Sequence, residues 1–268
     1  MTADITVVGL GISCTEHLTP EGDRAIRAAN EVLFVDTGVA TRAFLEQRCQ
    51  RVTDLYREGY VEGRDRVHTY HHMAARVVRA AQDHGPVVFA VQGHPTVFCY
   101  PPFLVREAAG LLGLSVVVQP GISSLACLFS ELMVDPGPLG IQMYEATDVL
   151  LRRRPLQPDV PLVLWQVGTL ESRIHSGRAS GPERFVRFRD HLIRFYPPTH
   201  VATAFYASPH PLAPSRKHAF ALGEMLDHAA ALDGGVTLYV PPAEHRPILD
   251  RELWALLDSA DHLDRISG

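Results

Sequence analysis

The first half of the chain shows two patterns of apolar and polar residues, one typical of strands and one typical of helices. Short runs rich in Val, Ile, Leu and Phe end at Gly, Pro or polar residues, as buried strands do. We expect such strands at residues 4–9, 31–36, 51–55, 86–92 and 114–118. Between them, apolar residues recur every three or four positions, which predicts helices over residues 19–30, 41–50, 65–84, 103–112 and 120–132. Strands that alternate with helices favour a parallel α/β sheet.

The sequence Asp-Pro-Gly-Pro at residues 135–138 is typical of a hinge. Beyond it, we expect a second set of strands at residues 140–144, 162–167, 200–206 and 235–240, with helices at 182–193 and 250–258. The pattern therefore predicts two α/β domains, an N-terminal one of residues 1–136 and a C-terminal one of residues 137–268. The Pro-rich residues 208–215 are expected to form a surface loop.

Composition narrows the classes of protein to which the chain can belong. Its 268 residues are 46% hydrophobic, enough for one large domain or for two medium ones with their own cores. A net charge of −5 argues against general affinity for nucleic acid or anionic membranes. The four Cys form no C-x-x-C pair, and the 14 His form no H-E-x-x-H. No apolar run approaches the roughly 20 residues of a membrane span, and signal-peptide features are absent. We expect a soluble, cytoplasmic protein without a metal site.

Several widespread ligand-binding motifs are missing. The turn Gly9-Leu-Gly11 resembles the start of a dinucleotide fingerprint, but Cys14 stands where the third Gly is required, so NAD is not expected. The sequence contains neither the phosphate loop G-x-x-x-x-G-K-[ST] nor the G-x-S-x-G turn of serine hydrolases.

Two loops after predicted strands are candidates for ligand binding, since open parallel sheets bind ligands at the carboxyl ends of their strands. In Gly93-His94-Pro95, the Gly lets the backbone approach a ligand, and the His94 ring can donate, accept or stack. An ordinary strand-to-helix turn is the alternative. At Ser123-Ser124, free backbone N–H groups at a helix start can bind a carboxylate or hydroxyl, and simple N-capping is the alternative.

A polar stretch precedes the longest predicted helix. Tyr60, Arg66 and Tyr70 bring two phenols and a guanidinium near the helix start, with Arg66 and Tyr70 one turn apart on one face. A fixed guanidinium can stabilise a carbonyl or a developing oxyanion, and it favours the ionised form of a phenol beside it. In the alternative interpretation, Tyr70 belongs to the core and Arg66 forms a surface ion pair with Glu62.

Together these features resemble the tetrapyrrole (corrin/porphyrin) methylases, a family that uses S-adenosylmethionine. The likeness is carried by Val7-Val-Gly-Leu-Gly11 with a following Leu-Thr, by the strand that ends in Gly-x-Pro, and by Pro120-Gly-Ile-Ser. Metabolic members have Gly-Pro-Gly-Asp where this chain has Gly11-Ile-Ser-Cys14, and Gly-Asp-Pro where it has Gly93-His-Pro95. Both departures match the borosin peptide α-N-methyltransferases, which methylate backbone amide nitrogens of a ribosomal precursor peptide.

Six segments carry the resemblance to this narrower branch, in order along nearly the whole chain. They are Asp54-Leu-Tyr56, Arg66-Val-His-Thr-Tyr70, Gly93-His-Pro95, Tyr144-Glu-Ala-Thr-Asp148, Gln166-Val-Gly168 and Tyr239-Val-Pro-Pro242. The resemblance implies a tetrapyrrole-methylase-like α/β fold with a Rossmann-like N-terminal domain, a second α/β domain, and a cofactor cleft between them.

The resemblance also implies site residues. S-adenosylmethionine is expected in the cleft without a metal, with S-adenosylhomocysteine as its product. The expected cofactor contacts are Gln92, His94, Val97, Ser123, Ser124, Gln166, Tyr206, Val236 and Thr237. Arg66 and Tyr70 match the catalytic Arg and Tyr of the family, Tyr60 matches a third site residue, and Tyr56 corresponds after a one-residue shift. Gln92 stands where the family often has Tyr.

Partners follow from the same resemblance. Fused borosins carry their substrate as a C-terminal extension, whereas this sequence ends at Gly268 without a hydrophobic peptide tail, so we expect a separate precursor peptide as substrate. The family implies a homodimer, or a heterotetramer with two precursors. Two other functions stay open: a tetrapyrrole C-methyltransferase, and an inactive domain that binds a peptide or S-adenosylmethionine. Arg66 and Tyr70 argue against the inactive domain.

Overall fold

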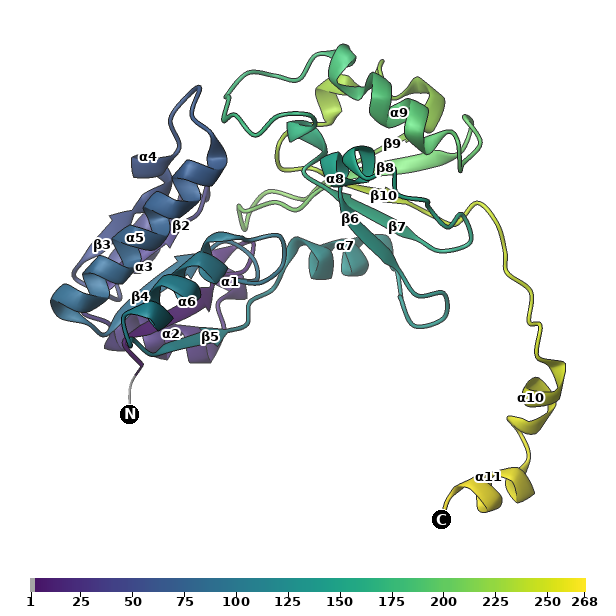
Figure 1. Ribbon diagram of the computed structural model, residues 1–268, viewed down its shortest axis with the longest axis horizontal. Helices are drawn as coiled ribbons and strands as arrows, with labels where there is room; N and C mark the ends of the chain where they lie inside the picture. The colour runs from purple at the N-terminus through teal and green to yellow at the C-terminus, as the bar shows by residue number, and fades with distance from the viewer. Residues whose placement is uncertain (1–2) are drawn as a thin grey trace.

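The computed structural model describes residues 3–268 and shows two α/β lobes side by side (Figure 1). The strands of the N-terminal lobe are β1 (Ile5–Gly9), β2 (Glu31–Val35), β3 (Val52–Asp54), β4 (Val87–Val91) and β5 (Val116–Gln119). They form one sheet in the order β3-β2-β4-β1-β5, and every neighbouring pair is parallel. The alternation of strands and helices predicted this parallel sheet, and the structure confirms it.

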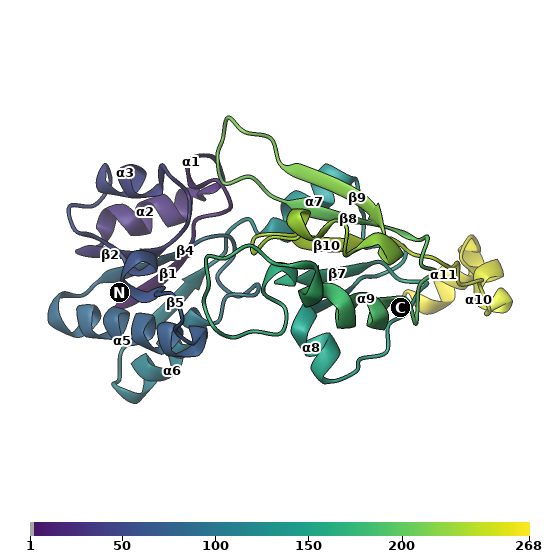
Figure 2. The same ribbon diagram turned by 90° about the horizontal axis from the view of Figure 1, so that it is seen from above.

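Helices cover both faces of the first sheet (Figure 2). On one face lie α2 (Pro20–Ala28) and α3 (Thr41–Glu46), and on the other lie α5 (Arg66–His84) and α6 (Pro101–Leu111). Strand side chains point alternately to the two faces, so each helix layer closes its own apolar core. Two single-turn helices, α1 (Cys14–His17) and α4 (Leu55–Gly59), lie in the connections.

The C-terminal lobe is built on a mixed sheet. Its strands are β6 (Gln142–Glu145), β7 (Leu162–Trp165), β8 (Val201–Tyr206), β9 (Arg216–Ala221) and β10 (Thr237–Val240), in the order β6-β7-β10-β8-β9. Only β6 and β7 run parallel, and the other neighbours are antiparallel. A buried cluster lies between this sheet and the helices α8 (Ala146–Leu151) and α9 (Val186–Leu192).

Helix α7 (Ser124–Leu132) joins the lobes. Its Leu128 is fully buried in a small cluster with Ile12 of the N-terminal lobe and with Phe205 and Ala207 of the C-terminal lobe. All first-sheet strands end before α7 and all second-sheet strands begin after it. We therefore propose that the two domains divide near residue 136.

The pattern of the sequence does not predict β9. Four of its six side chains are exposed, since it is the edge strand of the second sheet, and no apolar run marks it. The short helices α4 and α8 are not predicted by the pattern either, and each is capped by the carboxylate of the residue before it. Asp54 accepts a hydrogen bond from the N–H of Arg57 (3.1 Å), and Glu145 accepts one from the N–H of Asp148 (2.6 Å).

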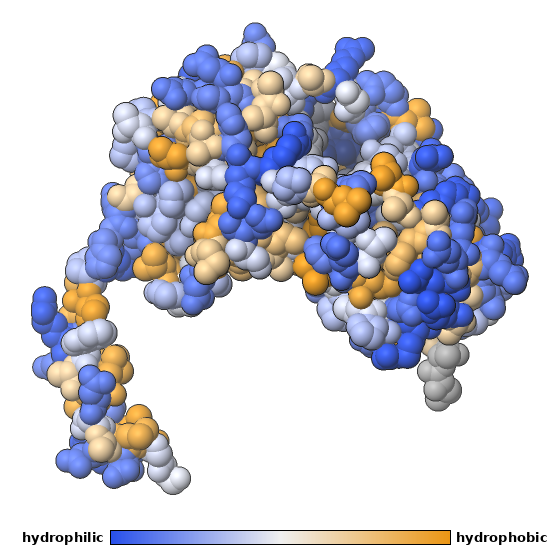
Figure 3. Space-filling model, turned by 180° about the vertical axis from the view of Figure 1, so that it is seen from behind, coloured by the Kyte–Doolittle hydropathy of each residue, from blue (hydrophilic) through white to orange (hydrophobic). Residues whose placement is uncertain are grey.

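The end of the described chain leaves the C-terminal lobe as an arm that carries α10 (Arg251–Leu256) and α11 (Ala260–Ile266) (Figure 1). Hydrophobic side chains such as Trp254 and Leu257 are exposed on it. Figure 3, which views the molecule from behind, shows hydrophobic residues along this arm. Among the described residues, none of the helices combines the length and the apolar character needed to cross a membrane.

One buried carboxylate ties α5 to the first sheet. Glu31 at the start of β2 accepts a hydrogen bond from Thr53 (2.6 Å) and contacts His84 Nε2 at the end of α5 (2.6 Å). Burial alone would raise the pKa of Glu31, but the hydrogen bonds from Thr53 and His84 outweigh burial and hold this pKa below its ordinary value.

Candidate active site

A cavity of about 700 Å³ lies between the lobes, at the carboxyl ends of the first-sheet strands. It is lined by all nine residues expected to contact the cofactor and by all four catalytic candidates. They are Gln92, His94, Val97, Ser123, Ser124, Gln166, Tyr206, Val236 and Thr237, together with Tyr56, Tyr60, Arg66 and Tyr70. The structure therefore brings together residues from both halves of the sequence. We refer to this space as the first cavity.

Four glycines pack the N-terminal loops of the first cavity tightly against one another. Gly93 has a φ of +75°, a conformation that Gly adopts without strain, and it exchanges backbone hydrogen bonds with Gly11. A Cβ added to Gly121 would collide with the Gly93 carbonyl and lie 2.7 Å from the Cα of Gly9. These close approaches place the loops after β1, β4 and β5 around one end of the cavity.

His94 and Ser123 each have a structural partner as well as a place on the cavity wall. His94 Nδ1 accepts a hydrogen bond from the N–H of Thr96 (3.2 Å), which leaves Nε2 as the donor of a neutral ring. Ser123 Oγ accepts from the N–H of Ala126 (3.4 Å) and so caps α7. The capping role considered for Ser123 is therefore present, and the same residue lines the cavity.

Arg66 is the first residue of α5, directly after Asp65, whose side chain caps the helix through the N–H of Val67 (2.7 Å). Its guanidinium reaches the opposite lobe. Nη1 donates to Thr169 Oγ1 (3.2 Å) and lies at 3.5 Å from Gln166 Oε1, while Nη2 donates to the backbone carbonyl of Ser172 (2.7 Å). The alternative in which Arg66 pairs with Glu62 is wrong.

Glu62 instead belongs to a short ladder between the two lobes. Its carboxylate accepts from Ser176 Oγ and from the N–H of Gly177, both at 2.9 Å. Backbone bonds continue the pairing from residues 63–66 to residues 173–175, with an antiparallel bridge between Asp65 and Ile174. The polar stretch before α5 is thus ordered by a loop of the C-terminal lobe.

Aromatic rings cluster beside Arg66. The Tyr60 ring lies 4.7 Å from the Tyr56 ring, 5.0 Å from the His175 ring and 6.5 Å from the Tyr70 ring, between centroids. Burial raises the pKa of Tyr60 well above its ordinary value, and the neighbouring Tyr70 raises it further. Tyr60 is therefore a neutral phenol that can donate a hydrogen bond at any physiological pH.

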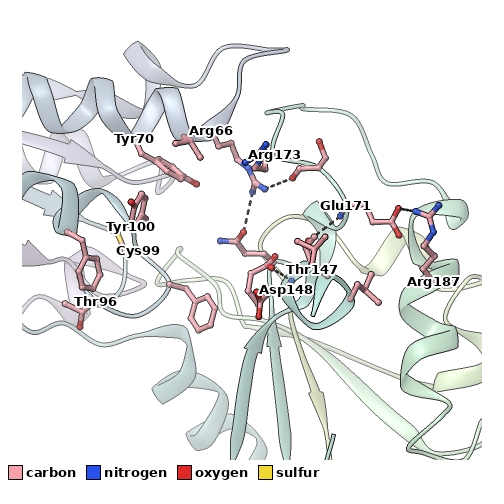
Figure 4. Close-up of a pocket in the computed structure, with 18 residues that line it drawn as sticks. Arg66, Tyr70, Thr96, Cys99, Tyr100, Thr147, Asp148, Glu171, Arg173 and Arg187 are labelled. Atoms are coloured by element: carbon pink, nitrogen blue, oxygen red, sulfur yellow. Dashed lines mark hydrogen bonds and ion pairs between the residues drawn. The ribbon is translucent and has the colours of Figure 1, made fainter. Parts of the chain in front are cut away.

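A second cavity of about 1080 Å³ adjoins the first, and Arg66, Tyr70, Phe98 and Gln166 line both. Figure 4 shows Arg66 and Tyr70 pointing into the second cavity from one side, with Glu171 and Arg187 across it. Its other walls carry mostly apolar side chains of α6, α8 and the loop before α6. Arg66 and Tyr70 therefore lie where two ligand-sized spaces meet, while Tyr56 and Tyr60 line the first cavity only.

Two strained residues mark the junction of the cavities. Phe98 and Gln166 have φ of +51° and +59°, although neither is Gly, and such positions cost about 1–3 kcal/mol each. The Phe98 ring stacks on Trp165 with centroids 4.1 Å apart, so the strained segments of the two lobes meet face to face. Strain retained at a ligand-lined junction is typical of a functional site.

Several residues of the site are not indicated by the sequence pattern. Phe98, Trp165, Thr169 and His175 contact the candidate groups or line the cavities, and Asp36 is a buried carboxyl on the wall of the first cavity. The end of a strand is a detectable signal for Asp36 and Trp165. Thr169 and His175 lie in an irregular loop and have no such signal. The described residues contain no group of three or more metal-ligating side chains.

Comparison with known proteins identifies the family. A sequence profile described as Tetrapyrrole (Corrin/Porphyrin) Methylases matches residues 4–154, more than half of the chain. The chain belongs to the tetrapyrrole methylase family. A solved relative in fold is the uroporphyrin-III C-methyltransferase of Thermus thermophilus in complex with S-adenosylhomocysteine, with a TM-score of 0.63 and 18% identity over 89% of this chain and 97% of that one.

Curated relatives place this tetrapyrrole methylase in the borosin branch. It is 31% identical to a methyltransferase/type I borosin cyclic peptide precursor of Coprinopsis marcescibilis, over 97% of this chain and 68% of that protein. It is also 31% identical to the methyltransferase/dendrothelin A precursor of Dendrothele bispora, over 91% of this chain and 59% of that protein. The chain thus spans about three-fifths to two-thirds of the length of these relatives.

Proposed function

We propose that this tetrapyrrole methylase transfers methyl groups from S-adenosylmethionine to backbone amide nitrogens of a peptide. The observation that carries the proposal is the junction of the two cavities. Arg66 and Tyr70 line both spaces, so one pair of side chains can contact a donor in the first cavity and an acceptor in the second. The borosin relatives, which combine a methyltransferase with a peptide precursor, support a peptide as acceptor.

The first cavity suits S-adenosylmethionine in size and in chemistry. Small-molecule sites occupy about 300–1,000 Å³, and this one has about 700 Å³. Apolar side chains such as Val97 and Val236 can cover an adenosyl group, while His94, Ser123 and Ser124 supply hydrogen-bonding groups at one end. When bound there, S-adenosylmethionine supplies an electrophilic methyl group on its sulfonium and leaves as S-adenosylhomocysteine.

A peptide nitrogen is a poor nucleophile because its lone pair is delocalised into the carbonyl. Methylation requires that negative charge grows on the carbonyl oxygen while the N–H proton is removed. Donors fixed at that oxygen lower the barrier. Arg66 retains unengaged N–H groups, and Tyr60 stays protonated, so we assign these two residues to the oxygen. We assign the amide proton to Tyr70, one helical turn from Arg66, which accepts it in its phenolate form and becomes a neutral phenol.

We further propose that the peptide belongs to a separate chain and that the enzyme is a homodimer. Within the described chain, the arm with α10 and α11 extends away from both lobes (Figure 1). The edge strand β5 exposes Val117 and Val118, close in sequence to exposed Leu111 and Leu112. A hydrophobic sheet edge of this kind favours burial against another copy. If light scattering detects only a monomer at micromolar concentration, the enzyme is not a homodimer.

The decisive experiment supplies S-adenosylmethionine with a deuterated methyl group and a pool of short synthetic peptides of mixed sequence. Tandem mass spectrometry should locate the label on backbone nitrogens of the peptides. The Tyr70→Phe variant should lose nearly all transfer while its affinity for S-adenosylhomocysteine stays within a few-fold of wild type. A parallel reaction contains a tetrapyrrole in place of the peptides. Label that reaches the tetrapyrrole and no peptide would overturn the proposal, and full activity of Tyr70→Phe would remove Tyr70 as the base.

A further inference from the structure

The Arg66 guanidinium is held from one side only. All three of its hydrogen-bond acceptors lie on the loop after β7, at Gln166, Thr169 and Ser172. A guanidinium carries five N–H donors, and in the described part of the chain these contacts engage at most three of them. The remaining donors are available to a substrate oxygen. The loop after β7 therefore sets the direction in which these remaining N–H groups of Arg66 point.

The Thr169 hydroxyl can only accept a hydrogen bond from Arg66, because its own proton is used elsewhere. Its hydroxyl and its backbone N–H both donate to the carbonyl of Gln166, at 3.1 and 2.9 Å. Since a carbonyl has no proton to give, the Thr169 hydroxyl proton is committed there, and its oxygen lone pairs are left for Arg66 Nη1 at 3.2 Å. This arrangement fixes both the rotamer and the polarity of the Thr169 side chain.

The other two contacts do not fix the guanidinium plane. The Gln166 side chain lies 3.5 Å from Nη1, at the limit of a hydrogen bond, and it ends in an amide that can rotate. The Ser172 carbonyl is a strong acceptor at 2.7 Å, but a single bond allows the guanidinium to pivot about it. Thr169 supplies the second fixed point, and these two points define the plane of the guanidinium together with its covalent attachment at Nε.

We propose that Thr169 is a positioning residue that aims the free donors of Arg66 at the amide oxygen of the acceptor. The inference rests on the proposed function for its catalytic consequence, although the orientation of Arg66 can be measured without any substrate. A misplacement of about 1 Å in a catalytic group can cost about 10²-fold in rate. Loss of Thr169 should therefore act on kcat and leave donor binding nearly intact.

The test compares Thr169→Val, which keeps the shape but removes the acceptor, with Thr169→Ser, which keeps the acceptor. Thr6→Val on β1 is the matched control, because Thr6 makes no side-chain hydrogen bond within the described chain. The side-chain Nε–H signal of Arg66 is followed by nitrogen relaxation with S-adenosylhomocysteine bound. Wild type, Thr169→Ser and Thr6→Val should show an ordered Arg66, and Thr169→Val should show a mobile one.

Turnover is then measured with the peptide pool. Thr169→Val should lose roughly 10- to 10²-fold in kcat, with KM for S-adenosylmethionine within a few-fold, and Thr169→Ser should restore most of the rate. An equally ordered Arg66 in Thr169→Val, or an unchanged kcat, overturns the inference. Wild-type protein with an ordered Arg66 that methylates no peptide overturns the proposed function instead, and the relaxation data still decide whether Thr169 orients Arg66.

Discussion

The Gly121→Ala variant should weaken donor binding by moving backbone rather than by removing a contact. The added Cβ would collide with the Gly93 carbonyl and lie 2.7 and 2.8 Å from the Cα and carbonyl carbon of Gly9. Non-bonded carbons prefer about 3.5–4.0 Å, so the loops must part by about 1 Å. Overpacking of this kind costs about 1–3 kcal/mol of folding stability.

The same displacement moves His94 and Ser123, which follow Gly93 and Gly121 on the wall of the first cavity. Each hydrogen bond lost to a ligand is worth about 0.5–1.5 kcal/mol, and about 1.4 kcal/mol is a tenfold change in affinity. Losing one or two of them, about 0.5–3 kcal/mol in all, predicts roughly 2- to 150-fold weaker binding of S-adenosylhomocysteine. Isothermal titration calorimetry measures this change directly, and a thermal melt measures the accompanying loss of stability.

Gly110→Ala is the matched control. Nothing lies within 4 Å of the Cβ that it would add on α6, and its backbone is helical. Ala in place of Gly in a helix should stabilise the fold by about 0.5–1 kcal/mol and leave binding unchanged. If Gly121→Ala binds S-adenosylhomocysteine like wild type and melts at the same temperature, the claim that the glycine contacts shape the donor loops is refuted.

Three further predictions concern single side chains. Arg66→Ala should lower the rate of methyl transfer by about 10²–10³ while the exposed Arg64→Ala does not, as assayed by mass spectrometry of the peptide pool. Tyr60→Phe should lower the rate without moving the pH–rate profile, because burial keeps the pKa of Tyr60 above the working range. The pKa of Glu31 lies below its ordinary 4.5, because hydrogen bonds from β3 and His84 outweigh burial. The ionised Glu31 therefore contributes its full stabilisation above pH 4.5, and this contribution is lost as the pH falls through the lower pKa that Glu31 has in the folded protein. The melting temperatures of wild type and Glu31→Gln should converge as the pH is lowered.

The cleft residues of the N-terminal lobe could be predicted because their positions follow from local rules. A buried strand that ends shortly before Gly93 places His94 at the carboxyl edge of a parallel sheet, and a helix start at Ser123 follows a strand two positions away in the same sheet. Arg66 and Tyr70 share a helix face by spacing alone. Resemblance to a family supplied the residues of the C-terminal lobe, such as Tyr206 and Thr237, and the structure lines the same cavity with them.

The residues that hold Arg66 could not be predicted in this way. Thr169 and Ser172 lie in a loop without periodicity, and their position depends on pairing between residues 62–66 and 173–177, over a hundred positions apart. Strand β9 could not be predicted for a related reason, since this exposed edge strand carries no apolar run. In both cases the structure arises from tertiary hydrogen bonding, which leaves no mark on the local pattern of hydrophobicity.

Arg66 and its hydrogen-bond acceptors belong to different lobes, so the orientation of Arg66 depends on how the lobes are placed. The guanidinium is carried by α5 of one lobe, and the three atoms that hold it belong to the other. Any motion that separates the lobes would stretch these hydrogen bonds and release the guanidinium from its fixed orientation. The orientation of Arg66 is therefore coupled to contact between the lobes: an arrangement with separated lobes would lack these three acceptors, and only the closed arrangement holds an oriented guanidinium at the first cavity.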